Sequence, residues 1–429
     1  MPQPVDLVLY NAGQLCTMPA HDGGPQRGFV LGDLGLVVDG AAAIHDGRVV
    51  AVGGSAEVRA AYTGATEIDA QGRLVTPGLV DPHTHLIWAG HRADEFEQRL
   101  RGASYQEIMA AGGGINRTVR ATRAATLDAL VATGMARLDT MLAHGTTTVE
   151  GKSGYGLETE TELRMLEALA RLDAAHPVDV APTFLGAHAV PPEFAGRTDA
   201  YVEQIVTEMI PAVRRWRAQR WPGVLFCDVF CEAGAFDLAQ TRRILEAAAD
   251  AGMALKVHAD EFENLGGVGL GVELGATSVD HLVETADAEI AAVGRSKTVA
   301  VSLPATPFGL RQAKYTPARR FLEAGAALAI ATDCNPGTAW CESMQFVMAL
   351  ATRYLGLTPA QALAAATINA AFAIERGDRV GSLEAGKLGD ALVWSVDDYR
   401  QLGYRFGVNL VDTVIKRGRV VCGPRSEAR

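Results

Sequence analysis

Two histidines separated by a single residue, His83 and His85, follow an apolar segment at residues 74–80. In extended backbone the side chains of residues i and i+2 point to the same side, so the two imidazoles can converge on one point. Neutral imidazole is the commonest side-chain ligand for metals and suits both zinc and iron, so the pair favours a metal site. The spacing alone leaves one alternative, a pair of surface histidines on an edge strand.

A carboxylate, Asp333, ends a second apolar segment at residues 328–332. Burying an unpaired carboxylate is costly, so this side chain needs a metal ion or a proton. A helix N-cap is the alternative role, although residues 334–338 look like a loop. Asp333, His258 and the two first histidines make a set of three nitrogens and one oxygen. Such a set leaves room for water, which is typical of a catalytic rather than a structural metal site.

Two further polar residues could act on a substrate beside such an ion. Glu261 stands three residues after His258. A carboxylate there can take a proton from water and hand it to a leaving nitrogen, although a solvated acid in a helix first turn is the alternative. His281 ends the segment at 277–280 and could bind a second metal ion or hydrogen-bond the water and a developing oxyanion.

The composition limits the classes of partner. The chain has 429 residues and a formal net charge of -11, which argues against a nucleic-acid or anionic-membrane surface. A small anionic substrate stays possible, because one local Arg can outweigh the overall field. The N-terminus has no signal-peptide pattern and no apolar run approaches the about 20 residues of a membrane span, so a cytoplasmic protein is expected. Six scattered cysteines are expected to be reduced, with Cys227 and Cys231 as structural thiols.

Short apolar segments alternate with Ala- and Leu-rich helical segments from about residue 78 onwards. This alternation predicts an α/β fold, a TIM-like (β/α)8 barrel, with an open doubly wound sheet as the competing topology. No predicted strand leads into a GxGxxG turn, which weakens the competing topology. Catalytic residues of a barrel lie at the carboxyl ends of its strands. The polar residues at those ends are His83, His85, Lys152, His188, His258, His281 and Asp333.

Both ends of the chain have the pattern of β structure. Short strands precede residue 78, including a hairpin that turns at Asp46 and Gly47 and a strand pair around Gly72. Similar segments return after residue 372. We therefore expect a small β-sandwich formed by residues 1–77 and 372–429, beside a barrel of residues 78–371.

The chain resembles the amidohydrolase superfamily. The segments at 76–85 and 381–391 carry this resemblance, together with the strand-ending His258, His281 and Asp333. Motifs of one ring-opening branch occur at 89–92, 112–115, 152–157, 184–188, 258–262 and 331–337. The resemblance implies one Zn(2+) or Fe(2+/3+) ion per chain, held by His83, His85, His258 and Asp333.

The resemblance also implies a reaction, hydrolysis of the cyclic amide C–N bond of 4-imidazolone-5-propanoate to N-formimidoyl-L-glutamate in histidine degradation. It implies Glu261 and His281 as catalytic residues. The implied substrate contacts are Arg92, Tyr155, His188, Glu261, Asn335, Gly337 and Thr338. The planar guanidinium of Arg92 suits a propanoate carboxylate.

Several alternatives stay open within this resemblance. Lys152 could be carbamylated, as in two-metal members, but the residues that follow it favour a charge partner. The rival functions are a cytosine- or guanine-type deaminase of the same superfamily and a non-catalytic barrel used as a scaffold. A homodimer is a possible assembly.

Overall fold

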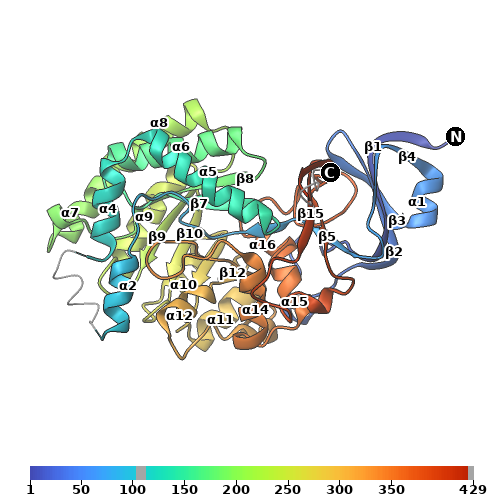
Figure 1. Cartoon of the computed structure of the whole chain (residues 1–429). Coiled ribbons are helices and arrows are strands. Elements are labelled where there is room, and N and C mark those ends of the chain that lie inside the picture. The colour runs from blue at the N-terminus through green and yellow to red at the C-terminus, as the bar shows by residue number, and fades with distance from the viewer. Residues whose placement is uncertain (103–112, 424–429) are drawn as a thin grey trace.

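The computed structural model describes residues 1–102 and 113–423. Eight parallel strands form a barrel surrounded by helices, and a second sheet lies at one side of it (Figure 1). The predicted (β/α)8 barrel is therefore confirmed. Its strands are β6 (Leu79–Asp81), β7 (Thr146–Lys152), β8 (Asp179–Ala187), β9 (Phe226–Cys231), β10 (Ala254–Ala259), β11 (Ser278–His281), β12 (Val299–Ser302) and β13 (Ala327–Ile330).

Helices connect the strands and cover the outside of the barrel (Figure 1). Polar N-caps mark several of their starts: Thr126 accepts from the amide of Ala129, and Asp237 forms a capping box with Gln240. The α-helices of this region are α2 (Ala93–Leu100), α4 (Ile115–Ala124), α5 (Leu127–Ala143), α6 (Thr159–Ala175), α7 (Thr198–Gln204), α8 (Ile210–Arg220), α9 (Leu238–Asp250), α10 (Gly267–Glu273), α11 (Asp287–Arg295), α12 (Ala305–Leu310), α13 (Ala318–Glu323), α14 (Met344–Tyr354), α15 (Pro359–Ala365) and α16 (Ile368–Phe372).

The barrel closes just beyond the strands at the two ends of its hydrogen-bonded order, β6 and β13. The amide of His85 donates to the carbonyl of Cys334 at 2.9 Å, and the amide of Asp333 donates to the carbonyl of His83 at 3.1 Å. The closing seam thus carries three of the four proposed metal ligands, His83, His85 and Asp333. Their backbone positions are fixed by the barrel and not by a free loop.

The barrel interior is layered. At the amino-terminal end it is apolar, with Phe226, Val299 and Ala327 packed near α16. Along each strand alternate residues point inward, so the next inward layers carry Asp228 and Lys256 and are polar. This layering places ionisable groups under the carboxyl-terminal mouth and an apolar plug at the other end.

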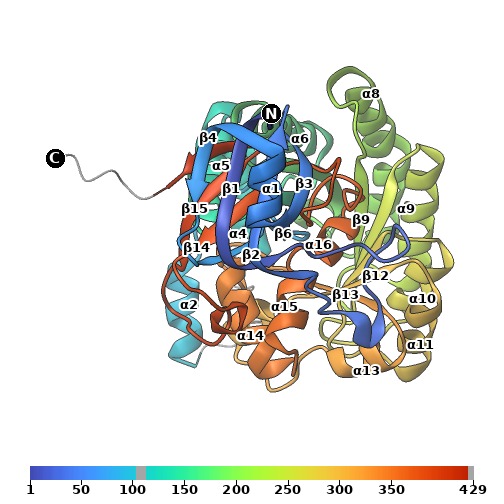
Figure 2. The same ribbon diagram turned by 90° about the vertical axis from the view of Figure 1, so that its right-hand side faces the viewer.

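The second sheet joins the two chain ends, as predicted. Strand β5 (Leu74–Pro77) pairs with β14 (Ala391–Trp394), and hydrogen bonding continues through all strands of this sheet. Figure 2 shows the N-terminal strands lying beside β14 and β15. The remaining strands are β1 (Gln3–Cys16), β2 (Leu36–His45), β3 (Arg48–Gly54), β4 (Tyr62–Asp69), β15 (Val411–Lys416) and β16 (Arg419–Cys422), with helix α1 at Ser55–Ala61.

Of the two strand pairs predicted for this sheet, one is present and the other is not. The turn at Asp46 and Gly47 joins β2 to β3 as predicted, with both residues at positive φ. The expected strand pair around Gly72 is wrong, because β4 and β5 do not pair with each other. Each pairs in parallel with a different part of the long strand β1. A 14-residue strand has enough edge to receive both, which a local turn pattern does not reveal.

A buried ion cluster joins the sheet to the barrel. Lys416 of β15 places its Nζ 2.7 Å from Asp179 of β8, 2.6 Å from Asp390 and 3.0 Å from the carbonyl of Thr147.

Within residues 1–102 and 113–423, no helix is both long and apolar enough to cross a membrane. The boundaries of the two proposed domains stay a prediction.

Candidate metal centre

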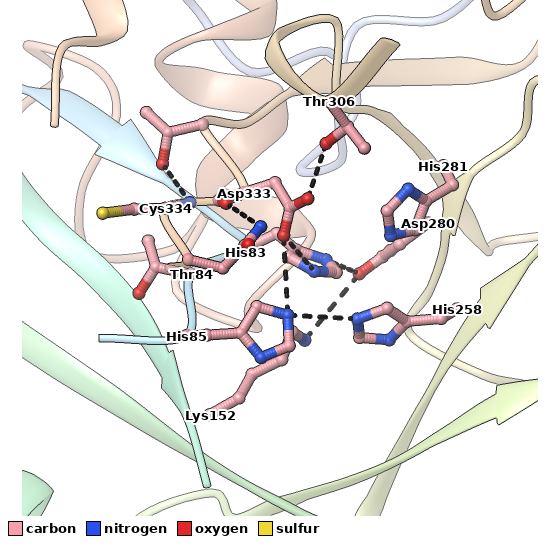
Figure 3. A network of polar contacts seen from close by, with 12 residues as sticks. His83, Thr84, His85, Lys152, His258, Asp280, His281, Thr306, Asp333 and Cys334 are labelled. Carbon is pink, nitrogen blue, oxygen red and sulfur yellow. Dashed lines mark hydrogen bonds and ion pairs between the residues drawn. The ribbon is translucent and has the colours of Figure 1, made fainter. Parts of the chain in front are cut away.

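His83 and His85 lie directly after β6, at the carboxyl-terminal mouth of the barrel. Their exposed fractions are 0% and 3%, so the alternative of two surface histidines is wrong. Their ring centroids are 5.6 Å apart, and both rings face the interior of the mouth (Figure 3). The closing seam described above holds the backbone of this pair.

His258 and Asp333 approach the same point from β10 and from the end of β13. The Nε2 atom of His258 lies 3.4 Å from Nε2 of His85. Asp333 Oδ1 lies 3.6 Å from Nε2 of His83 and 3.5 Å from Nε2 of His85. The N-cap alternative for Asp333 is wrong, because the next helix begins only at Met344. The four residues predicted to hold a metal therefore meet (Figure 3).

The unpartnered atoms of this group fit a cation. His83 Nε2 and Asp333 Oδ1 are buried and make no hydrogen bond with the described protein atoms. Burial lowers the pKa of both His83 and His85 well below the ordinary histidine value, so the rings are neutral and offer lone pairs. Lone pairs and a carboxylate oxygen facing one another are unfavourable without a positive charge among them. Nitrogen and oxygen ligands of this kind suit zinc and iron.

His281 and Glu261 lie beside these four residues. His281 Nδ1 is 3.6 Å from Glu261 Oε2, and His281 also forms a potential ligand group with His83 and Asp333. Burial lowers the pKa of His281 to about 3. Burial, followed by the charges of Asp333 and Glu232, raises the pKa of Glu261 well above its usual range. A carboxyl with a raised pKa can both receive and return a proton.

Two residues at strand ends of the mouth adopt an unusual backbone conformation. Asp333 has φ of 52° and His281 has φ of 82°, in the left-handed region that residues with a side chain seldom adopt. Each such residue costs about 1–3 kcal/mol and is typical of functional sites. The surrounding barrel must stabilise these conformations, which aim both side chains at the centre.

Tyr155 and His188 form one wall of the mouth. The His188 ring stacks on His85, with 4.8 Å between centroids and an interplanar angle of 17°. Its Nδ1 lies 2.9 Å from the carbonyl of Gly154, so the donor role falls to Nδ1 and leaves Nε2 for a ligand. Tyr155 is buried, and its ring centroid lies 5.2 Å from that of His188.

A second group of predicted substrate contacts consists of Arg92, Gly337 and Asn335. A Cβ on Gly337 would lie 2.6 Å from Arg92 Nη1, so only glycine allows the guanidinium this position. Asn335 shapes the loop, because its Oδ1 accepts from the amides of Gly337 and Thr338, each at 2.8 Å. Arg92 Nε donates to Glu95 at 2.9 Å, which holds the guanidinium in place.

Except for Lys152, the site residues predicted from the sequence lie on the strand ends and loops at one mouth of the barrel. Their roles as ligands, catalysts or substrate contacts stay predictions. Of the 112–115 motif, Gly112 lies outside the described residues, while the amide of Gly114 donates to Glu95 at 3.1 Å. This contact links the motif to Arg92.

Sequence reasoning missed the carboxylates behind the histidines. Asp280 lies 2.6 Å from His83 Nδ1, and Asp228 lies 2.9 Å from His258 Nδ1. Thr306 also donates to Asp333 at 2.5 Å. A signal was present for Asp228, which interrupts the apolar strand β9 at an inward position, whereas β11 around Asp280 is itself largely polar.

Lys152 lies below the centre and not at the mouth. Its Nζ is 2.7 Å from both Glu150 and Asp228. Burial alone would lower the pKa of Lys152, but Asp228 and Glu150 outweigh burial and raise it. Carbamylation requires a neutral amine, so this surrounding supports the interpretation as a charge partner.

Comparison with known proteins places this fold and site in a class. The model of the amidohydrolase family matches residues 74–421. The chain therefore belongs to the amidohydrolase family, whose members are metal-dependent hydrolases.

Its similarity to particular members is closer still. It is 54% identical to an imidazolonepropionase of Herpetosiphon aurantiacus, over 97% of each chain. It is 51% identical to an imidazolonepropionase of Chloroflexus aggregans, over 98% of this chain and 99% of that one. Within the amidohydrolases the chain groups with imidazolonepropionases, which are hydrolases acting on C–N bonds.

Solved structures show the same fold at low identity. A 5-methylcytosine deaminase from Klebsiella pneumoniae superposes with a TM-score of 0.72 at 17% identity, covering 98% of each chain. E. coli guanine deaminase gives a TM-score of 0.70 at 16% identity, covering 97% of this chain and 99% of that one. At such identity the likeness establishes the fold alone.

Proposed function

We propose that this protein hydrolyses the ring C–N bond of 4-imidazolone-5-propanoate to give N-formimidoyl-L-glutamate. The full-length similarity to imidazolonepropionases supports this reaction. The structural observation that carries it is Arg92, a cation held beside Gly337 at the mouth that contains the ligand group. A substrate with a propanoate needs such a cation, whereas a neutral nucleobase does not.

His83, His85, His258 and Asp333 would hold the ion, which we propose is Zn(2+) or Fe(2+), one per chain. When bound, it supplies Lewis acidity that polarises a carbonyl and makes water more acidic. The three imidazoles and one carboxylate give a set with room for a further ligand. Either ion suits these ligands, so the preference depends on supply as well as affinity.

Glu261 is proposed to carry the proton. Its raised pKa and its position beside the ligand group suit a carboxylate that takes a proton from the attacking water. The same group then protonates the ring nitrogen as the C–N bond breaks. His281, 3.6 Å from Glu261, would hydrogen-bond the attacking water or the developing oxyanion.

Arg92 is proposed to bind the propanoate, with Tyr155, His188, Asn335, Gly337 and Thr338 lining the rest of the pocket. A bidentate guanidinium contact fixes the orientation of the carboxylate as well as its position. Orientation matters because the amide carbonyl must lie over the ligand group for attack.

The test is a turnover assay on freshly prepared 4-imidazolone-5-propanoate, with cytosine and guanine as competing candidates. We expect consumption of the imidazolone, loss of that activity after chelation and its return with zinc or iron. Turnover of a nucleobase without turnover of the imidazolone would support the deaminase instead. No turnover of any of the three by metal-loaded protein would overturn the proposal.

A further inference from the structure

A layer of buried charges lies directly beneath the proposed metal ligands. His83 and His258 turn their Nε2 atoms to the centre and their Nδ1 atoms to carboxylates, at 2.6 Å from Asp280 Oδ2 and 2.9 Å from Asp228 Oδ2. The hydrogen bond between His83 Nδ1 and Asp280 holds the proton at Nδ1, so Nε2 of His83 keeps the lone pair that a metal needs. Asp228 makes an ion-pair contact with Nδ1 of His258. The two carboxylates therefore determine the orientation of both rings, with Nε2 facing the centre.

The same two carboxylate oxygens meet one cation. Lys152 Nζ lies 2.7 Å from Asp228 Oδ2 and 3.9 Å from Asp280 Oδ2. Asp228 is on β9 and Asp280 on β11, two strands that are separated by β10. Lys152 itself comes from β7, so its side chain extends into the barrel interior to reach them, and Figure 3 shows its contact with Asp280.

Other contacts fix each carboxylate but do not link the two. The amide of His258 donates to Asp228 Oδ1 at 3.1 Å, and Ser278 donates to Asp280 Oδ1 at 2.6 Å. Lys256 Nζ lies 3.6 Å from Asp280. Among the ion pairs of the described residues, only Lys152 contacts both acids.

Burying this group of charges has a desolvation cost, so a role other than stability must account for it. The side chains of Lys152, Glu150, Asp228 and Asp280 are all fully buried. Buried ion pairs are weak contributors to stability, because desolvation offsets most of the attraction. A well-packed apolar layer would stabilise the barrel as well, so the layer is better explained by what it orients.

We propose that Lys152 is a positioning residue for the metal centre, which links the carboxylates behind His83 and His258 so that both imidazoles face one ion. The proposal rests on the metal site of the proposed function and goes beyond it. Lys152 contacts neither the ion nor the substrate. Its effect passes through Asp228 and Asp280.

The test measures metal binding and not only activity. Zinc dissociation constants are determined by chelator competition for wild type, K152M and K416M, and each protein is also loaded with cobalt(II) for its visible absorption spectrum. K416M is the matched control, since Lys416 is another buried ammonium between two acids but belongs to the cluster between sheet and barrel. We expect zinc affinity to fall about 10–100-fold in K152M, with an altered cobalt spectrum, because outer partners of ligands have effects of that size.

K416M should lose stability and keep the zinc affinity and the cobalt spectrum of wild type. Zinc affinity within twofold of wild type in K152M, with an unchanged spectrum, would overturn the proposal. So would an equal loss of affinity in K416M, since that result would trace the effect to general destabilisation. If wild type itself binds no metal, the proposed function fails rather than this inference alone.

A second variant guards against misfolding of K152M. The double variant E150Q/K152M removes one negative and one positive charge together, so the buried net charge is unchanged. The proposal predicts weakened zinc binding here too, because the link between Asp228 and Asp280 is still missing. Wild-type affinity in the folded double variant would contradict it.

Discussion

The Nε2 atoms of His85 and His258 face each other at 3.4 Å, although 173 positions separate the two residues in the chain. Two imidazole nitrogens that face each other in this way cannot both donate to one another, whereas a shared cation would use a lone pair from each. Asp333 completes the group from a third segment.

The first prediction concerns metal content. Dialysis against a chelator should abolish activity, and titration of zinc or iron(II) into the apoprotein should restore it with one ion per chain, because one set of ligands converges. Elemental analysis and activity are measured on the same samples. Two ions per fully active chain would contradict the single-ion site and the interpretation of Lys152 as an unmodified charge partner.

The second prediction concerns Arg92. R92A should raise KM for 4-imidazolone-5-propanoate about 10–100-fold while metal content stays constant, since charged hydrogen bonds contribute about 1.5–3 kcal/mol. Steady-state kinetics with parallel metal analysis measures both. R101A is the control, because Arg101 is exposed on the same stretch of chain. An unchanged KM in R92A would exclude the propanoate role.

The third prediction concerns Glu261. E261Q removes the proton carrier but keeps the shape, so kcat should fall about 10²–10⁴-fold, the usual range for general acid–base catalysis. E263Q, two residues along and exposed, should behave like wild type. Metal analysis accompanies the kinetics to separate proton transfer from metal loss. A kcat within threefold of wild type would contradict the role of Glu261 as the proton carrier.

The fourth prediction concerns Gly337. G337A places a methyl group 2.6 Å from Arg92 Nη1, so the guanidinium must move. We expect KM to rise while kcat changes little, because Arg92 is proposed to bind and not to react. G54A is the matched control, since a Cβ at Gly54 meets nothing within 4 Å. Equal KM values for G337A and wild type would show that this contact does not position Arg92.

The fifth prediction concerns stability. K416M removes the cation of the buried Asp390 and one of the two cations paired with Asp179, the other being Arg417. The free energy of unfolding should therefore fall by about 3–5 kcal/mol. K314M breaks an exposed pair with Glu284 and should cost less than about 1 kcal/mol. Urea denaturation at pH 7 compares the two. Equal losses would mean that the cluster between sheet and barrel contributes no more than a surface pair.

The fifth prediction also has a pH dependence, because the cluster contains a buried carboxylate with a shifted pKa. Burial alone would raise the pKa of Asp179, but Lys416, followed by Arg417 and Arg376, outweighs burial and holds the pKa below the ordinary carboxyl value. A depressed folded-state pKa stabilises the protein above the unfolded pKa of about 4 and stops doing so as pH falls through the folded value. Between pH 6 and pH 3, wild type should therefore lose more stability than K416M does. Parallel loss in both proteins would contradict the role of this pair.

The sequence by itself determined much of the architecture and the residue types of the centre. Strand and helix periodicity is local, so the alternation after residue 78 was enough to predict the barrel. Because parallel strands of a barrel end at one mouth, the polar residues at strand ends could be grouped before any coordinates were known. His83 and His85 are the clearest case, since their spacing and the apolar segment before them are both local.

Tertiary structure decided what depends on contacts between distant segments. Local pattern showed neither that β4 and β5 pair separately with β1 nor that the barrel closes through His83, His85 and Cys334. The contacts of Asp228 and Asp280 were equally hidden, because an acid within a strand signals that it needs a partner but not which residue that partner is. That Lys152 reaches both acids follows only from barrel closure, which brings side chains of β7, β9 and β11 together in one small interior.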